Sequence, residues 1–383
     1  METYARVYQM YTLGVQYDLP NFASASDELK HRYNARTAGA LEHDRPIVGV
    51  TSNTVPWELL SAGGLSPVLL STSSSHDSLA GQYMEGGFDS RSRAIFDRLL
   101  SGEWSAVHTV VIPRTSEQEH KLFLYLREVA RQEPKRRLPI TLLYNLLHAR
   151  SEEARAYGLA RTRELCKTLG LISGEAMHRT IAEGNAARMA VRSLLHLRAD
   201  RLSGADALPL LGAYYFMDRA EYARIAARAA EELAANAPMR GPRVIIKGSM
   251  LDHPHLHSAI ERHGAIVAAE DDWWGSRAAG RDVASDGDPV EAVFLKYYED
   301  APSPRVFPAG VADAWFLETA PTAAGVIFYV APDDDVCGWD YPRWRSALDN
   351  RGIPHLLIRD DASAGDVPPE CHDRIETFVA GLK

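Results

Sequence analysis

Short apolar runs alternate with amphipathic stretches from residue 45 to residue 150. Compact apolar runs bounded by Gly, Pro and Ser are typical of buried strands, and apolar positions three and four residues apart are typical of helices. The strands predicted in this way are "RPIVGVTSN", residues 67–71, "AVHTVVIP" and "PITLLYNL", with helices between them. Strands that alternate with helices at this spacing predict a parallel sheet.

The strand pattern stops between Ser151 and about Ala237 and then resumes. Three long stretches in that interval carry apolar residues at helical spacing. The chain therefore divides into an N-terminal helical extension (residues 1–44), a first α/β lobe (45–150), a helical segment (151–238) and a second α/β lobe (239–383).

Charge and composition exclude several classes of protein. Apolar residues make up 46% of the 383 residues and charged residues 24%, which is ordinary for a globular enzyme. The net charge of −9 argues against a nucleic-acid-binding surface, although it permits a local basic pocket for one phosphorylated ligand. The N-terminus lacks the layout of a signal peptide, and no apolar run approaches about 18 residues, so we expect a cytoplasmic protein without a membrane partner.

An ordered series of motifs resembles one known family. The motifs are "GVTSNTVPWELLSAGGLSPVLL", "LSGEWSAVHTVVIPRTSE", "ISGEAMHRTIAEGNAARM", "RVIIKGSMLDHPHLHSAIERHGAIVAAEDDWWGSR", "WDYPRWRSALDNRGIPHLLI" and "RIETF". Together they are similar to the subunits of 2-hydroxyacyl-CoA dehydratases and benzoyl-CoA reductases. The resemblance implies two flavodoxin-like parallel α/β lobes with the ligand between them. It also implies an acyl-CoA or small acyl substrate and a homologous subunit as partner, in a heterodimer or homodimer.

The resemblance further implies a [4Fe-4S] cluster held by three cysteines, which passes one electron to the thioester. The matching positions here read Ser116, Phe88 or Asp89, and Asp334. The chain's cysteines are instead Cys166, Cys337 and Cys371. One shifted thiolate cannot hold a four-iron cluster, so we expect a chain without the cluster. No metal ligands are assigned, although the acidic run Asp333 to Asp335 could bind a hard cation in place of the cluster, with Asp89 or Glu117 across the cleft.

Four residues are candidates for acid–base chemistry: Ser116, Glu117, Asp334 and Glu58. Each also has a structural interpretation. Ser116 and Glu117 are suited to cap the helix that starts there, Glu58 suits the first turn of its own helix, and Asp334 lies in an acidic run that a solvated loop explains.

The candidate substrate-binding residues lie near predicted strand ends or on one helical stripe: Ser52, Asn53, Phe88, Asp89, Trp273, Trp274, Arg277, Asn185 and Arg188. For the two tryptophans the alternative is packing, and for Arg188 it is a salt bridge between lobes. The sequence thus predicts a dehydratase-family protein, either a cluster-free enzyme or one subunit of a heterodimer with a cluster-bearing paralogue. The alternative is a non-catalytic scaffold or ligand-binding subunit that has lost the iron–sulfur site.

Overall fold

The first lobe is built on a four-stranded parallel sheet. A computed structural model describes residues 22–36, 45–71, 79–170, 174–300, 303–359 and 367–382. The strands follow the order β2-β1-β3-β4, with bounds β1 Ile47–Val50, β2 Ser66–Leu69, β3 Val107–Pro113 and β4 Ile140–Tyr144. β1 is buried along its whole length, as expected of a strand covered on both faces.

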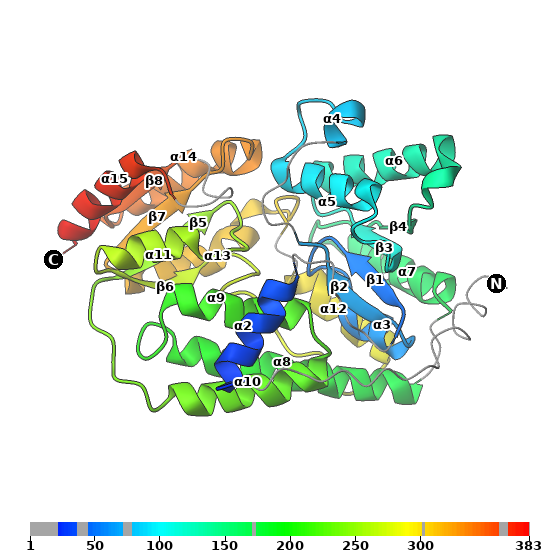
Figure 1. Cartoon of the computed structure of the whole chain (residues 1–383), viewed down its shortest axis with the longest axis horizontal. Coiled ribbons are helices and arrows are strands. Elements are labelled where there is room, and N and C mark those ends of the chain that lie inside the picture. Colours follow the sequence, from blue (N-terminus) through cyan, green and yellow to red (C-terminus); the bar gives the residue numbers. More distant parts are fainter. Residues whose placement is uncertain are drawn as a thin grey trace.

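Helices cover both faces of this sheet (Figure 1). Helices α5 (Ser90–Ser101) and α6 (Glu117–Gln132) lie side by side on one face. Helices α3 (Trp57–Ala62), α7 (Glu152–Thr168) and α12 (Pro289–Asp300) cover the other face, and the short α4 spans Ala80–Tyr83. The return of α12 to this lobe links it to the second half of the chain.

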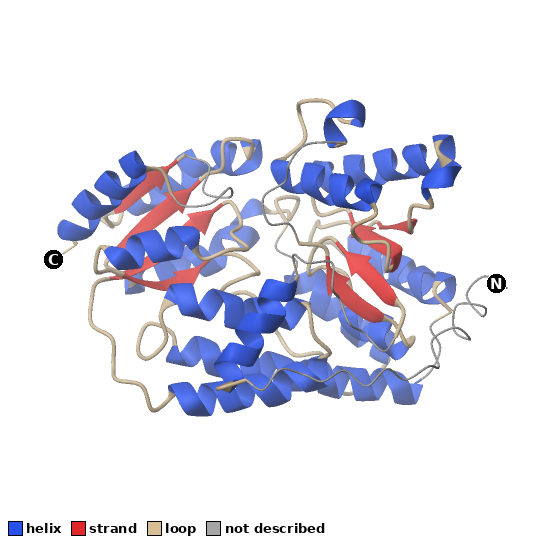
Figure 2. Cartoon of the chain, viewed as in Figure 1, coloured by secondary structure: helices blue, strands red, loops and turns tan. Residues whose placement is uncertain are grey.

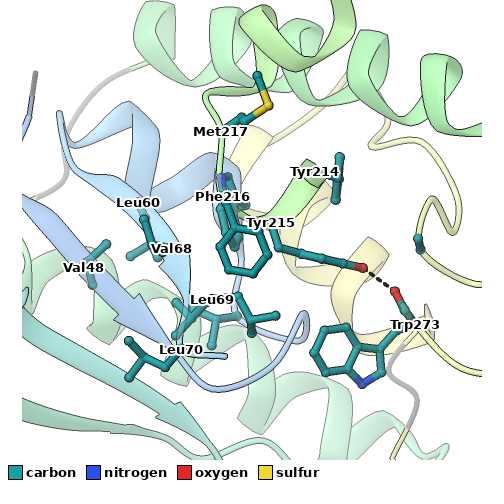
Figure 3. Close-up of a cluster of buried hydrophobic side chains, with 14 of the residues drawn as sticks. Val48, Leu60, Val68, Leu69, Leu70, Tyr214, Tyr215, Phe216, Met217 and Trp273 are labelled. Atoms are coloured by element: carbon teal, nitrogen blue, oxygen red, sulfur yellow. Dashed lines mark hydrogen bonds between the residues drawn. The ribbon is translucent and has the colours of Figure 1, made fainter. Parts of the chain in front are cut away.

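The helical segment between the lobes shares its core with the first lobe. Its helices are α8 (Gly174–Leu197), α9 (Gly204–Gly212) and α10 (Arg219–Leu233), with a 3₁₀ turn at Ala213–Tyr215. Helix α2 (Ala25–Ala35) packs against α9 and α10. One continuous hydrophobic cluster includes strands of the first sheet and the residues Tyr214 to Met217 (Figure 3). The rest of the predicted N-terminal extension, residues 1–21 and 37–44, lies outside the described residues.

The second lobe repeats the first, with the parallel order β6-β5-β7-β8 (Figure 2). Its strands are β5 Arg243–Gly248, β6 Ile266–Glu270, β7 Gly325–Tyr329 and β8 His355–Ile358. Its helices are α11 His255–Arg262, α13 Ala309–Thr319, α14 Asp335–Asp349 and α15 Pro369–Ala380. Helices α11 and α15 form one hydrophobic cluster with the sheet, while α13 and α14 form another.

The prediction of two flavodoxin-like parallel lobes with helices between them is confirmed. The stretch "YPRWRSALDNRG" predicts a helix from residue 341, but α14 begins at Asp335 and includes Pro342. Proline removes one helical hydrogen bond. At the start of the helix, the Asp334 side chain accepts a hydrogen bond from Cys337 N at 3.0 Å and so caps a free amide of the first turn. Within the described residues, no helix has the length and apolar character needed to cross a bilayer.

Candidate functional site

Ligands of parallel α/β sheets bind at the carboxyl ends of the strands, where neighbouring connections leave in opposite directions. In the first lobe this point lies between β1 and β3, because β2 and β3 flank β1. Thr51 follows β1, and its hydroxyl donates to Glu119 Oε1 at 2.9 Å. Thr115, beyond the end of β3, donates from its amide to Glu119 Oε2 at 3.0 Å and also from its hydroxyl. A buried carboxyl group therefore joins the ends of the two central strands.

Ser116 and Glu117 form the first turn of α6. The Ser116 side chain accepts from Glu119 N at 3.1 Å, so it caps the helix. Glu117 is 64% exposed and forms an ion pair with Arg305, with Arg114 at 3.7 Å. Ser116 thus has the capping role, while Glu117 lies in the first turn of the helix and is ion-paired; a catalytic role for either stays a prediction.

The two lobes meet at the start of α5. Asp89 caps this helix through a hydrogen bond from Ser92 N at 2.6 Å. The next amide, Ser90 N, donates to Oδ2 of Asp333 in the second lobe at 2.5 Å. Burial raises the pKa of the Asp89 carboxyl above its ordinary value. Phe88 points elsewhere, since it is buried against Tyr125 with ring centroids 5.0 Å apart.

Asp334 caps α14 and also accepts from the Ser249 hydroxyl at 2.7 Å. The three stretches matched to the family's cysteines are neighbours in space. Gln118 Nε2 donates to Gly87 O at 3.0 Å, which joins the start of α6 to the loop before α5, and Asp333 joins that loop to the second lobe. The matched positions therefore converge, but each supplies a helix cap in place of a thiolate.

The cysteines lie in three different parts of the core. Cys166 packs against the hydrophobic cluster of the first lobe. Cys371 lies in the hydrophobic cluster on the α11–α15 side of the second sheet, and Cys337 packs against the one on the α13–α14 side. Burial raises the pKa of the Cys337 thiol well above its ordinary value, and the neighbouring Asp334 raises it further. No group of three His, Cys, Asp or Glu side chains among the described residues is arranged to hold a metal ion. These residues do not fit a [4Fe-4S] cluster, which needs several thiolates at one point.

Glu58, in the first turn of the helix that follows β1, forms an ion pair with Arg188. Arg188 is fully buried, and its Nη1 donates to Glu58 Oε1 at 2.6 Å. Tyr297 donates to the other Glu58 oxygen at 2.8 Å. Burial alone would raise the pKa of Glu58, but Arg188 and Lys296 lower it below its ordinary value. This network joins α3, α8 and α12. Of the two interpretations of Arg188, substrate binding and a salt bridge, the structure shows a salt bridge.

Asn185 is also occupied by the fold. Its side chain accepts from Val283 N and donates to Val283 O, both at 2.9 Å. It therefore holds the loop before α12 against α8.

Trp273 and Trp274 are buried in the aromatic part of the core. The Tyr215 hydroxyl donates to the Trp273 carbonyl, as Figure 3 shows. Trp274 is 1% exposed and packs on Tyr215 with ring centroids 5.3 Å apart. Arg277 pairs with Asp271 at 3.2 Å. Packing accounts for the two indoles, and their role toward a substrate stays a prediction.

Ser52 and Asn53 lie directly after β1, as predicted. The Ser52 hydroxyl is 2.7 Å from that of Thr54. Oδ1 of Asn53 is buried and has no hydrogen-bond partner among the described residues. Of the predicted residues, these two lie closest along the chain to the switch point between β1 and β3.

Three residues of interest lie outside the list of candidate site residues given above. Arg91, in the first turn of α5, donates to the Thr51 carbonyl, and its guanidinium carbon lies 5.8 Å from the centre of a Trp273 ring. Burial raises the pKa of Glu119, although Thr115 and Arg91 beside it favour the charged form. Burial, with Glu270 nearby, raises the pKa of Asp272 to about 7. Arg91 and Glu119 lie in the first turn of a helix, and Asp272 follows a strand by two residues. Position at a strand end or helix start is therefore the sequence feature that could have identified them.

A surface hollow lies elsewhere, at the amino ends of strands β5 and β6 of the second sheet. Its volume is about 620 Å³, and its lining includes Pro242, Gly264 and Glu376. Ligands of this architecture bind at the opposite edge, so geometry favours the strand ends described above.

The sequence model of the 2-hydroxyglutaryl-CoA dehydratase D-component family matches residues 53–382. The chain belongs to this family. Among curated proteins it is 22% identical over 329 residues to the (R)-phenyllactyl-CoA dehydratase beta subunit of Clostridium sporogenes, covering 82% of this chain and 86% of that protein. It is 25% identical over 210 residues to subunit beta of the (R)-2-hydroxyglutaryl-CoA dehydratase of Acidaminococcus fermentans, covering 52% and 55%. The family predicted from the ordered motifs is thus confirmed.

Proposed function

We propose that this dehydratase-family chain is the cluster-free subunit of a two-component acyl-CoA dehydratase. It acts on a CoA thioester together with a homologous subunit that carries the iron–sulfur cluster. The observation that carries the proposal is the separation of Cys166, Cys337 and Cys371 into three hydrophobic clusters. Both relatives are named as beta subunits of dehydratases of acyl-CoA substrates, which supports a two-subunit arrangement.

The predicted acid–base residues favour a subunit over an independent enzyme. Ser116 and Asp334 are occupied as helix caps, and Glu117 is exposed and ion-paired. Glu58 is committed to the buried pair with Arg188. Neither the Ser116 hydroxyl nor any of the three carboxyl groups is free for proton transfer, so the acid–base chemistry is assigned to the partner together with the redox chemistry of its cluster.

The test begins with metal content. We expect the chain, purified alone without oxygen, to contain no stoichiometric iron or labile sulfide. Co-expression with a cysteine-bearing homologue is expected to give a stable mixed dimer whose cluster belongs to the partner and whose dehydratase activity requires both chains. A brown preparation of this chain alone that dithionite bleaches contradicts the proposal.

A non-catalytic scaffold is the second candidate. This candidate is favoured because Ser116, Asp89 and Asp334 all serve as helix caps. Capping explains why polar residues stand at the positions matched to the cluster cysteines of the family. In a mixed dimer, a scaffold predicts an unchanged KM for the thioester when polar groups at the strand ends of this chain are removed. The dehydratase subunit predicts a raised KM.

A further inference from the structure

Arg91 is a half-buried cation at the boundary between the two lobes. Its one hydrogen bond in the described chain runs to the carbonyl oxygen of Thr51. No described carboxylate forms an ion pair with it, whereas Arg188 pairs with Glu58 and Arg277 with Asp271. The remaining donors of the guanidinium therefore have no partner among the described residues.

The two nearest carboxyl groups compensate this charge poorly. Asp89 caps helix α5 by accepting a hydrogen bond from Ser92 N. The Glu119 carboxyl group accepts hydrogen bonds from Thr51 and Thr115. Burial raises the pKa of both carboxyl groups above their ordinary values, although Arg91 beside them favours the charged forms. Among the described residues, neither carboxyl group forms an ion pair with Arg91, since each accepts its hydrogen bonds from other groups.

A guanidinium that has lost part of its hydration is stabilised by a hydrogen-bonded anion. Its planar set of five N–H donors matches the two oxygens of a carboxylate. The site of Arg91 also offers the Trp273 ring on one side and the strand end of β1 on the other. These are the features of a position that orients a small organic acid.

We propose that Arg91 binds an acyl oxygen of the substrate, either the carboxylate of a 2-hydroxy acid or the carbonyl of its CoA thioester, at the carboxyl end of β1. The choice of acyl class rests on the proposed function. A single guanidinium beside an indole suits an acyl oxygen better than a phosphate, because phosphates are usually held by a glycine-rich turn. The turn after β1 reads "TSNTVP" and contains no glycine.

The test compares binding of three probes by isothermal titration calorimetry: (R)-phenyllactyl-CoA, (R)-phenyllactate and free CoA. The variants are Arg91→Gln, Arg91→Lys and the control Arg93→Gln, which lies on the same helix and donates to Glu85 O at 3.2 Å. Loss of a charge-assisted hydrogen bond predicts that Arg91→Gln raises the Kd of the thioester and of the free acid roughly 10- to 100-fold. The lysine variant is expected to lie between, since it keeps the charge without the planar fork. Free CoA and the control variant are expected to behave as the wild type does.

Each other outcome decides the matter. Wild-type affinity in Arg91→Gln overturns the proposal, and so does an equal loss of affinity for free CoA, which would assign Arg91 to a phosphate. Arg91-dependent binding of the free acid alone supports the proposal while contradicting the proposed action on a thioester. If Arg91→Gln fails to fold, the lysine variant decides: an affinity equal to the wild type's overturns the proposal. If the isolated chain binds none of the probes, the titrations are repeated on the mixed dimer, and absence of binding there also overturns it.

Discussion

Arg188 and Arg91 show two uses of the same side chain in neighbouring regions. At the junction of α3, α8 and α12, Arg188 is fully buried and paired with Glu58 at 2.6 Å. At the carboxyl edge of the first sheet, Arg91 is half-buried and bonded to a backbone carbonyl. The first region satisfies its charge within the fold, while the second leaves donors for a ligand. The comparison teaches that pairing, more than position in a motif, separates a structural arginine from a candidate binding residue.

The largest expected effect comes from breaking the paired region. Replacing Arg188 with Leu leaves the Glu58 carboxylate buried without its main partner, so we expect a loss of about 3–5 kcal/mol in the free energy of unfolding. The measurement is urea denaturation followed by circular dichroism. The double variant Glu58→Leu/Arg188→Leu is expected to recover most of the loss, because it leaves no unpaired charge. A single variant as stable as the wild type would show that the pair does not hold the junction.

Local pattern was enough to predict the fold, because the sheet and most helices depend on hydrophobic periodicity. The stretch "EQEHKLFLYLREVARQ" predicts a helix at the observed bounds of α6. The pattern predicts no helix at the position of α9, because Pro209 interrupts a fully buried apolar run. The site was harder to predict, because pairing joins distant parts of the chain. Glu58 and Arg188 are 130 residues apart, and nothing in the sequence around Arg91 marks it as unpaired.

The same contrast exists between two carboxyl groups of the second lobe, Glu270 and Asp272. Burial alone would raise the pKa of Glu270, but Arg198 and His257 lower it to about 2. Among the described residues no cation pairs with Asp272, and burial raises its pKa to about 7. In Asp272 the folded state holds its proton more tightly than the unfolded state, so the free energy of unfolding is expected to fall as pH rises from about 4 to 7.

Asp272→Asn is expected to remove this pH dependence. An asparagine oxygen still accepts from Gly275 N, as Asp272 does at 2.7 Å, so the turn is retained. Because the side chain is only half-buried, we expect the variant to gain about 1–2 kcal/mol relative to the wild type between pH 5 and pH 8. Urea denaturation at the two pH values measures it. Glu270→Gln is the contrasting control, because the contribution of that ion pair is present above pH 4.5 and is lost toward pH 2.

The smallest effect separates Ser116 from Glu117 within a single helical turn. Ser116 caps α6 through Glu119 N, so Ser116→Ala is expected to cost about 1 kcal/mol of stability. Glu117 is 64% exposed, and exposed ion pairs contribute little, so Glu117→Ala is expected to cost less than about 0.5 kcal/mol. Thermal unfolding of the two variants measures both values. If Glu117→Ala leaves stability unchanged but raises the KM of the mixed dimer for the thioester, Glu117 serves the substrate and the predicted catalytic region includes the start of α6. If KM is unchanged as well, Glu117 has only a structural role, and Arg91, with its unpaired donors, remains the candidate substrate-binding residue of this region. That outcome agrees with the contrast between Arg91 and the paired Arg188.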